Sequence, residues 1–212
     1  MYKFTVINDQ SPWLPEVYNA ILPFKTNGFL VEIGVGHTLE GPHYQQRTDP
    51  SLGRCGSNTA DLLDLGWSGI YIDPVKEYCI EATLSHKNNL DRLKIINNGC
   101  SDIEEEATIY FGDTFAYNNK QDSRYEWLGR KVKCFPAKKI LSENNCPQDI
   151  DIMSIDVEGY ELKVLQGMDF NLHSPKIIIV EINQVGTTAV HNLLPGYNLY
   201  RQDTLNAVFV RK

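Results

Sequence analysis

Residues 154–167 read SIDVEGYELKVLQG, and this stretch decides the fold that the sequence predicts. Its first part completes the apolar run Ile150–Asp156, which is rich in β-branched residues and too short for a helix. Near-continuous apolar runs of this length are typical of strands buried on both faces of a parallel sheet. The second part, Tyr160–Gly167, is helix-like, so the stretch predicts a strand, a turn and a helix in succession.

The same pairing of a short apolar run with a helix-like stretch recurs along the chain. This alternation predicts an α/β domain with a parallel sheet and right-handed crossovers. The last two runs, Tyr197–Arg201 and Asn206–Val210, lie close together in sequence and predict a terminal antiparallel hairpin. Further strands are expected at Phe29–Ile33, Gly69–Asp73, Leu93–Asn97 and Lys176–Ile182, and further helices at Ser57–Leu65, which opens with capping residues and stops at Gly66, and at Val75–Leu84.

Three segments fall outside this alternation. Residues 1–28 are expected to form a helical lead-in. The polar loop His37–Gly56 is about twenty residues long, a length that is typical of functional loops in compact domains. An extra strand pair, Ala107–Phe111 and Lys131–Phe135, flanks the polar stretch Asp113–Arg130, which we interpret as a flap.

Composition sets the class of protein. The chain has 212 residues and a mass of 24.1 kDa, so residues 1–212 are expected to form a single domain. Its 27 acidic and 20 basic side chains leave a net charge of −7, which argues against a protein that holds a nucleic-acid backbone. The five scattered cysteines indicate free thiols in a reducing compartment. Without a long apolar run or a signal-peptide pattern, the sequence predicts a soluble, cytoplasmic protein with no membrane span.

Acidic residues gather where the predicted strands end. In an open parallel sheet, ligands bind in the crevice beyond the carboxyl ends of the strands. Four of the five buried strands end in a carboxylate, and the fifth is followed by one. The side chains at these ends belong to Glu32, Asp73, Ser101, Asp102, Asp156, Glu158 and Glu181. We therefore expect the chemistry of this protein to lie in that crevice.

The turn Gly34-Val-Gly36 lets a ligand approach the backbone, or is a tight turn that serves packing. A dinucleotide-binding fingerprint would place a third glycine where Leu39 stands. It would also place an acid about twenty residues further on, whereas Asp73 lies well beyond that distance. The sequence therefore disfavours a nicotinamide cofactor.

The acids of the crevice suit an adenosyl cofactor. Asp73 stands where an acid accepts hydrogen bonds from ribose hydroxyls, although Asp73-Pro74 could serve only as the entry to a helix. Asp102 could accept from an adenine amino group or cap a helix after Ile103. Because the chain carries no phosphate-binding P-loop, a cationic cofactor without phosphates fits best, and S-adenosylmethionine has this polarity.

Several motifs resemble those of FkbM-type S-adenosylmethionine-dependent methyltransferases. Residues 154–167 are similar to the D-V-E-G-x-E block of that family. Gly66–Pro74, preceded by Ser57-Asn58-Thr59, resembles its G-W-x-G and S-N-T elements. Asn98–Asp102 resembles its A-x-S-D element, and Glu181 resembles the acid at the end of its fifth strand.

This resemblance covers residues 29–212 and implies both a fold and a cofactor. The implied fold is a Rossmann-like class I methyltransferase, with a seven-stranded, mostly parallel sheet, a C-terminal antiparallel hairpin and helices on both faces. The chain departs from the family at Ser154, where many members have a lysine, and in its longer loop between Gly36 and Ser57. The implied cofactor is S-adenosyl-L-methionine, and the residues expected to bind it are Glu32, Gly34, Gly36, Asn58, Asp73, Ser101 and Asp102.

Asp156 and Glu158 lie at the mouth of the central strand, where we expect the acceptor. Two carboxylates so close together are harder to ionise, so one pKa should be raised, which suits a general base or a group that grips sugar hydroxyls. Alternatively, Asp156 caps the helix that begins near Gly159, and Glu158 bonds a loop amide. His37, directly after the glycine turn, is a third candidate base, or a residue that orders the loop.

No metal site is expected. His37, His43, Asp49 and Cys55 lie six residues apart in the long loop. A structural zinc site has closer ligand pairs, and magnesium prefers oxygen ligands. Chance placement is therefore the better explanation.

The resemblance implies O-methylation of a hydroxyl on a sugar or another small-molecule acceptor. Two alternatives stay open: an RNA ribose 2′-O-methyltransferase, and a non-catalytic module that binds the cofactor or nothing. Against the first, Asp156 and Glu181 have no obvious lysine partner and the pI is about 5.2, so no nucleic-acid partner is expected. Against the second, the set of strand-end acids is intact.

Overall fold

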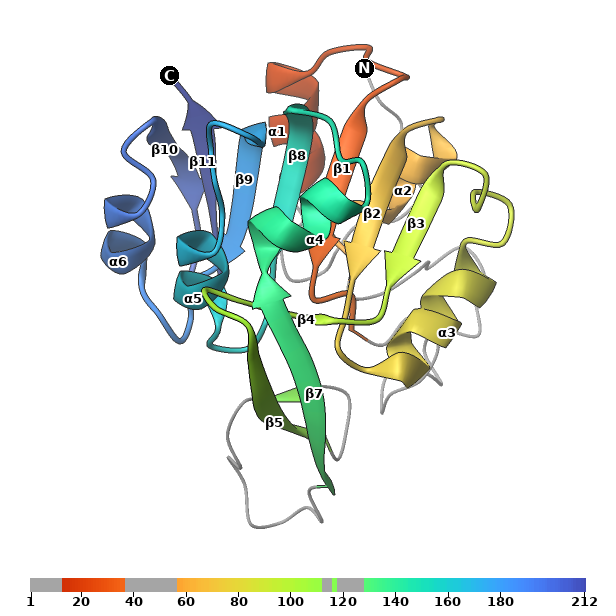
Figure 1. Ribbon diagram of the computed structural model, residues 1–212. Coiled ribbons are helices and arrows are strands. Elements are labelled where there is room, and N and C mark those ends of the chain that lie inside the picture. The colour runs from red at the N-terminus through yellow and green to blue at the C-terminus, as the bar shows by residue number, and fades with distance from the viewer. Residues whose placement is uncertain (1–12, 37–56, 112–115, 118–127) are drawn as a thin grey trace.

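A seven-stranded sheet forms the centre of the molecule (Figure 1). The computed structural model describes residues 13–36, 57–111, 116–117 and 128–212. The strand order is β10-β11-β9-β8-β1-β2-β3, which confirms the predicted seven-stranded sheet. The strands are β1 (Phe29–Ile33), β2 (Ser68–Ile72), β3 (Leu93–Ile96), β8 (Asp149–Ile155), β9 (Ser174–Glu181), β10 (Tyr197–Gln202) and β11 (Asn206–Arg211).

Five neighbouring strands of this sheet, β9, β8, β1, β2 and β3, run parallel to one another. The hairpin of β10 and β11 completes the sheet beside β9. β1 lies between β2 and β8, with Leu30 opposite Gly69 on one side and Ile152 on the other. β11 pairs antiparallel with both β9 and β10, as the sequence predicts for the C-terminal hairpin. Because parallel strands end at one edge of a sheet, the carboxylates at the ends of β1, β2, β8 and β9 are brought to the same side of the molecule.

Three helices cover each face of the sheet. Apolar side chains of α1, α2 and α3 pack into one core cluster, and those of α4, α5 and α6 into the other. This arrangement confirms the predicted helices on both faces and explains why the strands are apolar on both sides. No helix within the described ranges is long and apolar enough to cross a membrane. The helices are α1 (Leu14–Ile21), α2 (Ala60–Asp64), α3 (Lys76–Ser85), α4 (Ala137–Glu143), α5 (Glu161–Gln166) and α6 (Thr187–Asn192).

A second sheet projects from the edge at which the parallel strands end (Figure 1). It has the order β4-β7-β5-β6, with β4 (Gly99–Ser101), β5 (Glu105–Phe111), β6 (Ala116–Tyr117) and β7 (Leu128–Pro136). The predicted strand pair forms its middle, because β5 and β7 pair antiparallel. Of the predicted flap, 128–130 belong to β7 and 116–117 to β6, while 113–115 and 118–127 lie outside the described residues.

Four elements of the structure are not expected from the sequence: the helices α4 and α6 and the strands β4 and β6. These four elements are short, between two and seven residues each, so they show little periodicity. Of the residues expected to form the helical lead-in, 14–21 form α1, and 1–12 lie outside the described part of the chain. The long loop 37–56 also lies outside it.

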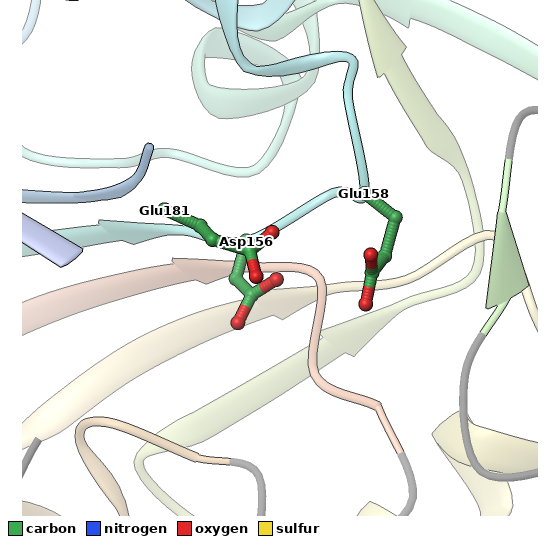
Figure 2. A group of neighbouring side chains, drawn as sticks. All are labelled: Asp156, Glu158 and Glu181. Atoms are coloured by element: carbon green, nitrogen blue, oxygen red, sulfur yellow. The ribbon is translucent and has the colours of Figure 1, made fainter. Parts of the chain in front are cut away.

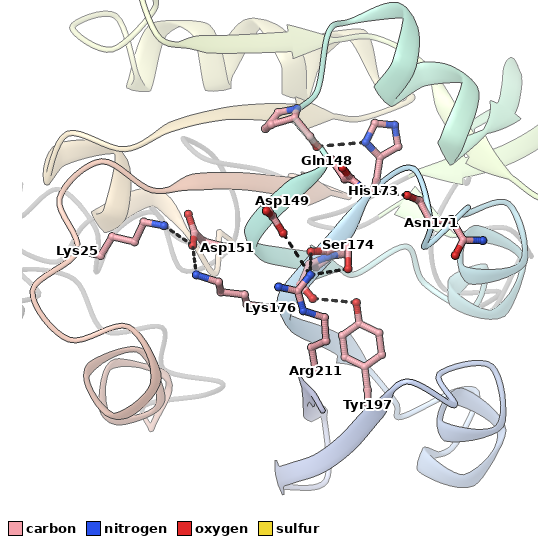
Figure 3. A network of polar contacts seen from close by, with 12 residues as sticks. Lys25, Gln148, Asp149, Asp151, Asn171, His173, Ser174, Lys176, Tyr197 and Arg211 are labelled. Carbon is pink, nitrogen blue, oxygen red and sulfur yellow. Dashed lines mark hydrogen bonds and ion pairs between the residues drawn. The ribbon is translucent and has the colours of Figure 1, made fainter.

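A network of ion pairs and hydrogen bonds closes the opposite, amino-terminal edge of the sheet (Figure 3). Asp151 of β8 is buried, and its carboxylate accepts a hydrogen bond from Phe29 N at 2.9 Å. Lys25 Nζ lies 2.5 Å and Lys176 Nζ 3.5 Å from the same carboxylate. The buried charge is therefore neutralised by two cations, which ties the segment before β1 to β8 and β9.

Replacing Asp151 should destabilise the fold, and replacing its neighbour Asp149 should not. Asp151→Ala leaves the Phe29 amide and Lys25 without their acceptor, so we expect a loss of about 2–3 kcal/mol in the free energy of unfolding. Asp149 pairs with Arg211 at the surface, so Asp149→Ala should change it by less than about 1 kcal/mol. Urea unfolding measures both, and equal losses in the two variants would contradict this view.

The turn after β1 packs directly against the end of β8. Gly34 has φ +85°, and a Cβ at this position would lie 1.6 Å from the carbonyl oxygen of Asp156. Gly36 also has a positive φ, +63°, yet a Cβ there would meet no described atom within 4 Å. Both positions therefore favour glycine because their φ is positive, but only at Gly34 does the absence of a Cβ also let the turn approach the backbone of Asp156 closely.

This difference makes the two glycines a matched pair. Gly36→Ala should cost about 1–2 kcal/mol, because only the left-handed conformation penalises the new Cβ. Gly34→Ala adds an overlap with backbone that cannot rotate away, which raises the loss by about 1–3 kcal/mol or more. Thermal unfolding of both variants measures the difference. If Gly34→Ala is as stable as Gly36→Ala, the close packing of the turn on β8 is not required.

Candidate active site

Glu32 holds the start of α2 against the end of β1. Its side chain is only 1% exposed, and it accepts hydrogen bonds from Ser57 Oγ at 2.7 Å and from Asn58 N at 2.9 Å. The hydroxyl of Thr59 donates to it as well. Burial raises the pKa of Glu32 to about 7, against the lowering effect of these donors. The residues expected to cap the α2 helix therefore satisfy a buried carboxylate instead, and α2 begins only at Ala60.

Asn58 links this segment to the central strand. The side-chain amide of Asn58 donates a hydrogen bond to Ser154 Oγ at 2.9 Å, and its backbone carbonyl oxygen accepts one from the Tyr18 hydroxyl at 2.6 Å. Ser154 is the position at which the chain departs from the family pattern. Here the small hydroxyl group serves as a buried acceptor between β8 and the turn that leads into α2.

Asp73 follows β2 and shapes the glycine turn. It is 3% exposed, and one of its oxygens accepts from Val35 N at 2.8 Å and from Gly36 N at 3.1 Å. The other oxygen accepts from Val75 N at 2.8 Å, just before α3. The helix-entry role considered for Asp73 is therefore present, together with a bracing role that the sequence did not predict. A contact with ribose stays a prediction.

Ser101 and Asp102 lie where β4 leads into β5. Ser101 Oγ lies 2.5 Å from Glu105 Oε1 and 3.1 Å from Asp102 Oδ1. Glu105 in turn pairs with Lys163 of α5 at 2.9 Å. The alternative that Asp102 caps a helix is wrong, because the strand β5 follows it. Contacts of Ser101 and Asp102 with a cofactor stay predictions.

Three carboxylates meet beyond the ends of β8 and β9 (Figure 2). Asp156 follows β8, Glu158 lies in the turn before α5, and Glu181 ends β9. One carboxylate oxygen of each lies within 4.8 Å of those of the other two, and we call this group the acid triad. The structure thus brings together the two predicted catalytic carboxylates. The sequence marks Glu181 only as an acid at the end of a predicted strand. This place at the strand end is the signal that could have assigned it to the site.

The acid triad is electrostatically strained. Burial and the charges of the neighbouring acids raise the pKa of Glu158 to about 8, against a hydrogen bond from Gln184 Nε2 at 3.0 Å. Burial raises the pKa of Asp156 as well, and burial together with the Asp156 charge raises that of Glu181. Glu181 Oε1 accepts a hydrogen bond from Asn183 at 2.8 Å, and the interaction of the Glu181 side chain with that of Asp156 helps to raise the pKa of Glu181. No ion pair within the described ranges joins a lysine or arginine to the triad.

Such a group can accept a proton, bind hydroxyls or hold a hard cation. A carboxylate with a raised pKa is a stronger base than an ordinary one, and it is protonated nearer to neutral pH. Oxygen ligands at this spacing are also those that a cation such as Mg²⁺ prefers, although acids gather in this way without a metal too. The expectation of no metal stays a prediction, and the loop residues weighed as ligands, His37 to Cys55, lie outside the described residues.

The alternative role of Asp156 is wrong, because no described side chain caps α5 and the amides of Val157 and Gly159 bond to Glu161. The alternative role of Glu158 is present, because Glu158 accepts a hydrogen bond from the side-chain amide of Gln184 in the loop after β9. The third candidate base, His37, lies outside the described residues.

Glu181→Gln should stabilise the protein at alkaline pH. Because the folded-state pKa is raised, ionisation opposes folding, so the wild type loses stability as the pH rises above the ordinary glutamate value of 4.5. A glutamine cannot ionise, and its amide oxygen can still accept from Asn183. We expect the variant to be more stable by about 1–2 kcal/mol at pH 8, and equal to the wild type near pH 4.

Thermal unfolding between pH 4 and pH 9 measures this difference. Glu77→Gln is the control, because Arg130 lowers the pKa of Glu77 and the substitution should have the opposite sign. A Glu181→Gln variant that is no more stable than the wild type at pH 8 would refute the raised pKa.

Comparisons with known proteins agree with this architecture. The model of the methyltransferase FkbM domain matches residues 49–199. A search of curated protein sequences finds no match.

Solved structures with this fold include two methyltransferases. The first is the 16S rRNA N2 G1207 methyltransferase (RsmC) of T. thermophilus, in complex with AdoMet and guanosine, with 9% identity and a TM-score of 0.54, over 97% of this chain and 43% of that chain. The second is a ribosomal protein L11 methylase from Lactobacillus delbrueckii subsp. bulgaricus, with 11% identity and a TM-score of 0.50, over 97% of this chain and 80% of that chain. At such identities the likeness shows the fold alone. Because the family model matches well over half of the chain, we conclude that this protein belongs to the FkbM methyltransferase family.

Proposed function

We propose that this protein is an S-adenosylmethionine-dependent methyltransferase that methylates a hydroxyl of a sugar or another small-molecule acceptor. One observation carries the proposal: the glycine turn after β1 packs against Asp156, so a candidate cofactor cradle lies directly beside the acid triad. Membership of the family supports methyl transfer. The hydroxyl acceptor is supported by the proton-accepting chemistry of the triad.

The glycine turn fits S-adenosylmethionine. Among the described residues, no atom lies within 4 Å of the position of a Cβ at Gly36, and Asp73 accepts hydrogen bonds from the amides of Val35 and Gly36 in the turn. When bound, the cofactor supplies an electrophilic methyl group on a sulfonium. We propose that it is held by the residues expected from the sequence, which are Glu32, Gly34, Gly36, Asn58, Asp73, Ser101 and Asp102.

We assign Asp156 as the general base. It directly follows the central strand β8 and lies nearest to the glycine turn, and its raised pKa makes it a better proton acceptor than an exposed aspartate. Glu158, partly exposed at the edge of the triad, is assigned to grip an acceptor hydroxyl. His37 stays a second candidate base, because it follows the glycine turn in sequence.

A neutral, hydroxyl-bearing acceptor suits the charge of this site. A phosphodiester backbone would have to approach the Asp156 carboxylate and its acidic neighbours in a chain of net charge −7, and like charges repel. Sugar hydroxyls instead donate hydrogen bonds to carboxylates. This argument favours a small-molecule acceptor over RNA.

Calorimetric titration tests the cofactor. We expect S-adenosylhomocysteine to bind with a micromolar Kd and NADH not to bind, because the turn lacks the dinucleotide fingerprint. Transfer of a labelled methyl group from S-adenosylmethionine to a panel of sugars, other hydroxyl compounds and RNA then tests the acceptor. Binding of NADH alone would overturn the proposal, and transfer only to RNA would overturn the acceptor class.

Asp156→Asn separates catalysis from cofactor binding. Loss of a general base should lower turnover about 100-fold or more, and S-adenosylhomocysteine affinity should change by less than about threefold. Asp149→Asn, at the opposite edge of the sheet, is the matched control and should retain wild-type turnover. Equal losses of turnover and affinity in Asp156→Asn would instead place Asp156 against the cofactor.

A further inference from the structure

The turn between Asp156 and α5 has an unusual backbone. Glu158 adopts a left-handed conformation with φ +54°, and Gly159 follows it with φ +100°. A left-handed conformation suits glycine but is uncommon for a glutamate, and it costs about 1–2 kcal/mol. Some interaction must therefore hold the turn in this shape.

Glu161 makes the hydrogen bonds that can do so. Its Oε1 accepts from Val157 N at 3.0 Å and from Gly159 N at 3.0 Å, that is, from the amides on both sides of Glu158. Glu161 is the first residue of α5 and is only 1% exposed, so these bonds are partly shielded from water, which strengthens them. The backbone amides of the residues before and after Glu158 are thus held by one carboxylate.

Charge does not explain the presence of Glu161. The buried Glu161 carboxylate beside the half-buried acid triad raises the pKa values of Asp156, Glu158 and Glu181, so it adds repulsion to a group that already repels itself. Its second oxygen, Oε2, has no hydrogen-bond partner among the described residues. What Glu161 contributes is therefore the geometry of the turn. Without that geometry, repulsion within the triad would drive the Glu158 side chain toward water.

We propose that Glu161 is a positioning residue that holds the turn so that the Glu158 carboxylate joins Asp156 and Glu181. The proposal deepens the proposed function, since it rests on Glu158 as the group that grips the acceptor. It acts through the backbone, because the hydrogen bonds that Glu161 accepts come from the amides of Val157 and Gly159.

The titration of Glu158 reports its position without any acceptor or cofactor. In the wild type its pKa is raised to about 8 by burial and by the charge of Asp156. If the turn relaxes and the side chain moves into water, this pKa returns toward the ordinary glutamate value of 4.5. Carbon-13 NMR of the glutamate carboxyl groups measures it, and the resonance that is lost in Glu158→Gln identifies the signal.

Glu161→Ala and Glu161→Gln form the decisive pair. Both remove the charge of Glu161, but only glutamine keeps an oxygen that can accept from Val157 N and Gly159 N. We expect the Glu158 pKa to fall by about one pH unit or less in Glu161→Gln, and by about two or more in Glu161→Ala. Equal Glu158 pKa values in the two variants would overturn the proposal.

Glu161→Asp keeps the test decisive if the alanine variant fails to fold. It retains the negative charge, but its shorter side chain cannot reach both amides. We expect the Glu158 pKa to fall below that of the wild type, although the charge beside it is unchanged, and a wild-type value would refute the proposal. Because this titration needs neither cofactor nor acceptor, its outcome is independent of whether the protein transfers a methyl group to a hydroxyl.

Discussion

The site depends on the contact between Gly34 and the carbonyl oxygen of Asp156. Any side chain at Gly34 would place its Cβ 1.6 Å from that oxygen, so the turn after β1 can reach the end of β8 only as glycine. The contact is continued by the hydrogen bond from Asp156 N to Ile33 O at 2.9 Å. It places the glycine turn and the acid triad at one edge of the sheet, and the proposed chemistry needs both there.

Buried carboxylates have different kinds of partners at the two edges of the sheet. At the amino edge, Asp151 is neutralised by Lys25 and Lys176, and the result is a closed, stabilising network. At the carboxyl edge, Glu32, Asp73 and Glu161 accept hydrogen bonds from hydroxyl groups or backbone amides, and each of them shapes a turn. The acid triad has neither kind of full compensation. Its charges remain poised to take up a proton or to bind a ligand, as functional groups with raised pKa values do.

Much of the fold could be predicted from local pattern. The apolar runs of β1, β8 and β9 are nearly continuous because helices cover both faces of the sheet, and their bounds were placed within two residues. α4 and α6 were missed because they are short and carry no clear period. The candidate site was predicted less completely. Asp156 and Glu158 were expected to lie together, whereas the bracing role of Asp73 and the hydrogen bonds of Glu161 to the turn before α5 were not.

The sequence by itself determined the order of strands and helices, and it showed that carboxylates stand where strands end. These features follow from residue periodicity and chain direction, which are local properties. Only the tertiary structure decided which carboxylates meet, because that depends on the strand order β9-β8-β1-β2 and on how each turn bends. Glu161 lies three residues from Glu158 in sequence, yet its role follows from a left-handed backbone and buried amides that no residue pattern reveals.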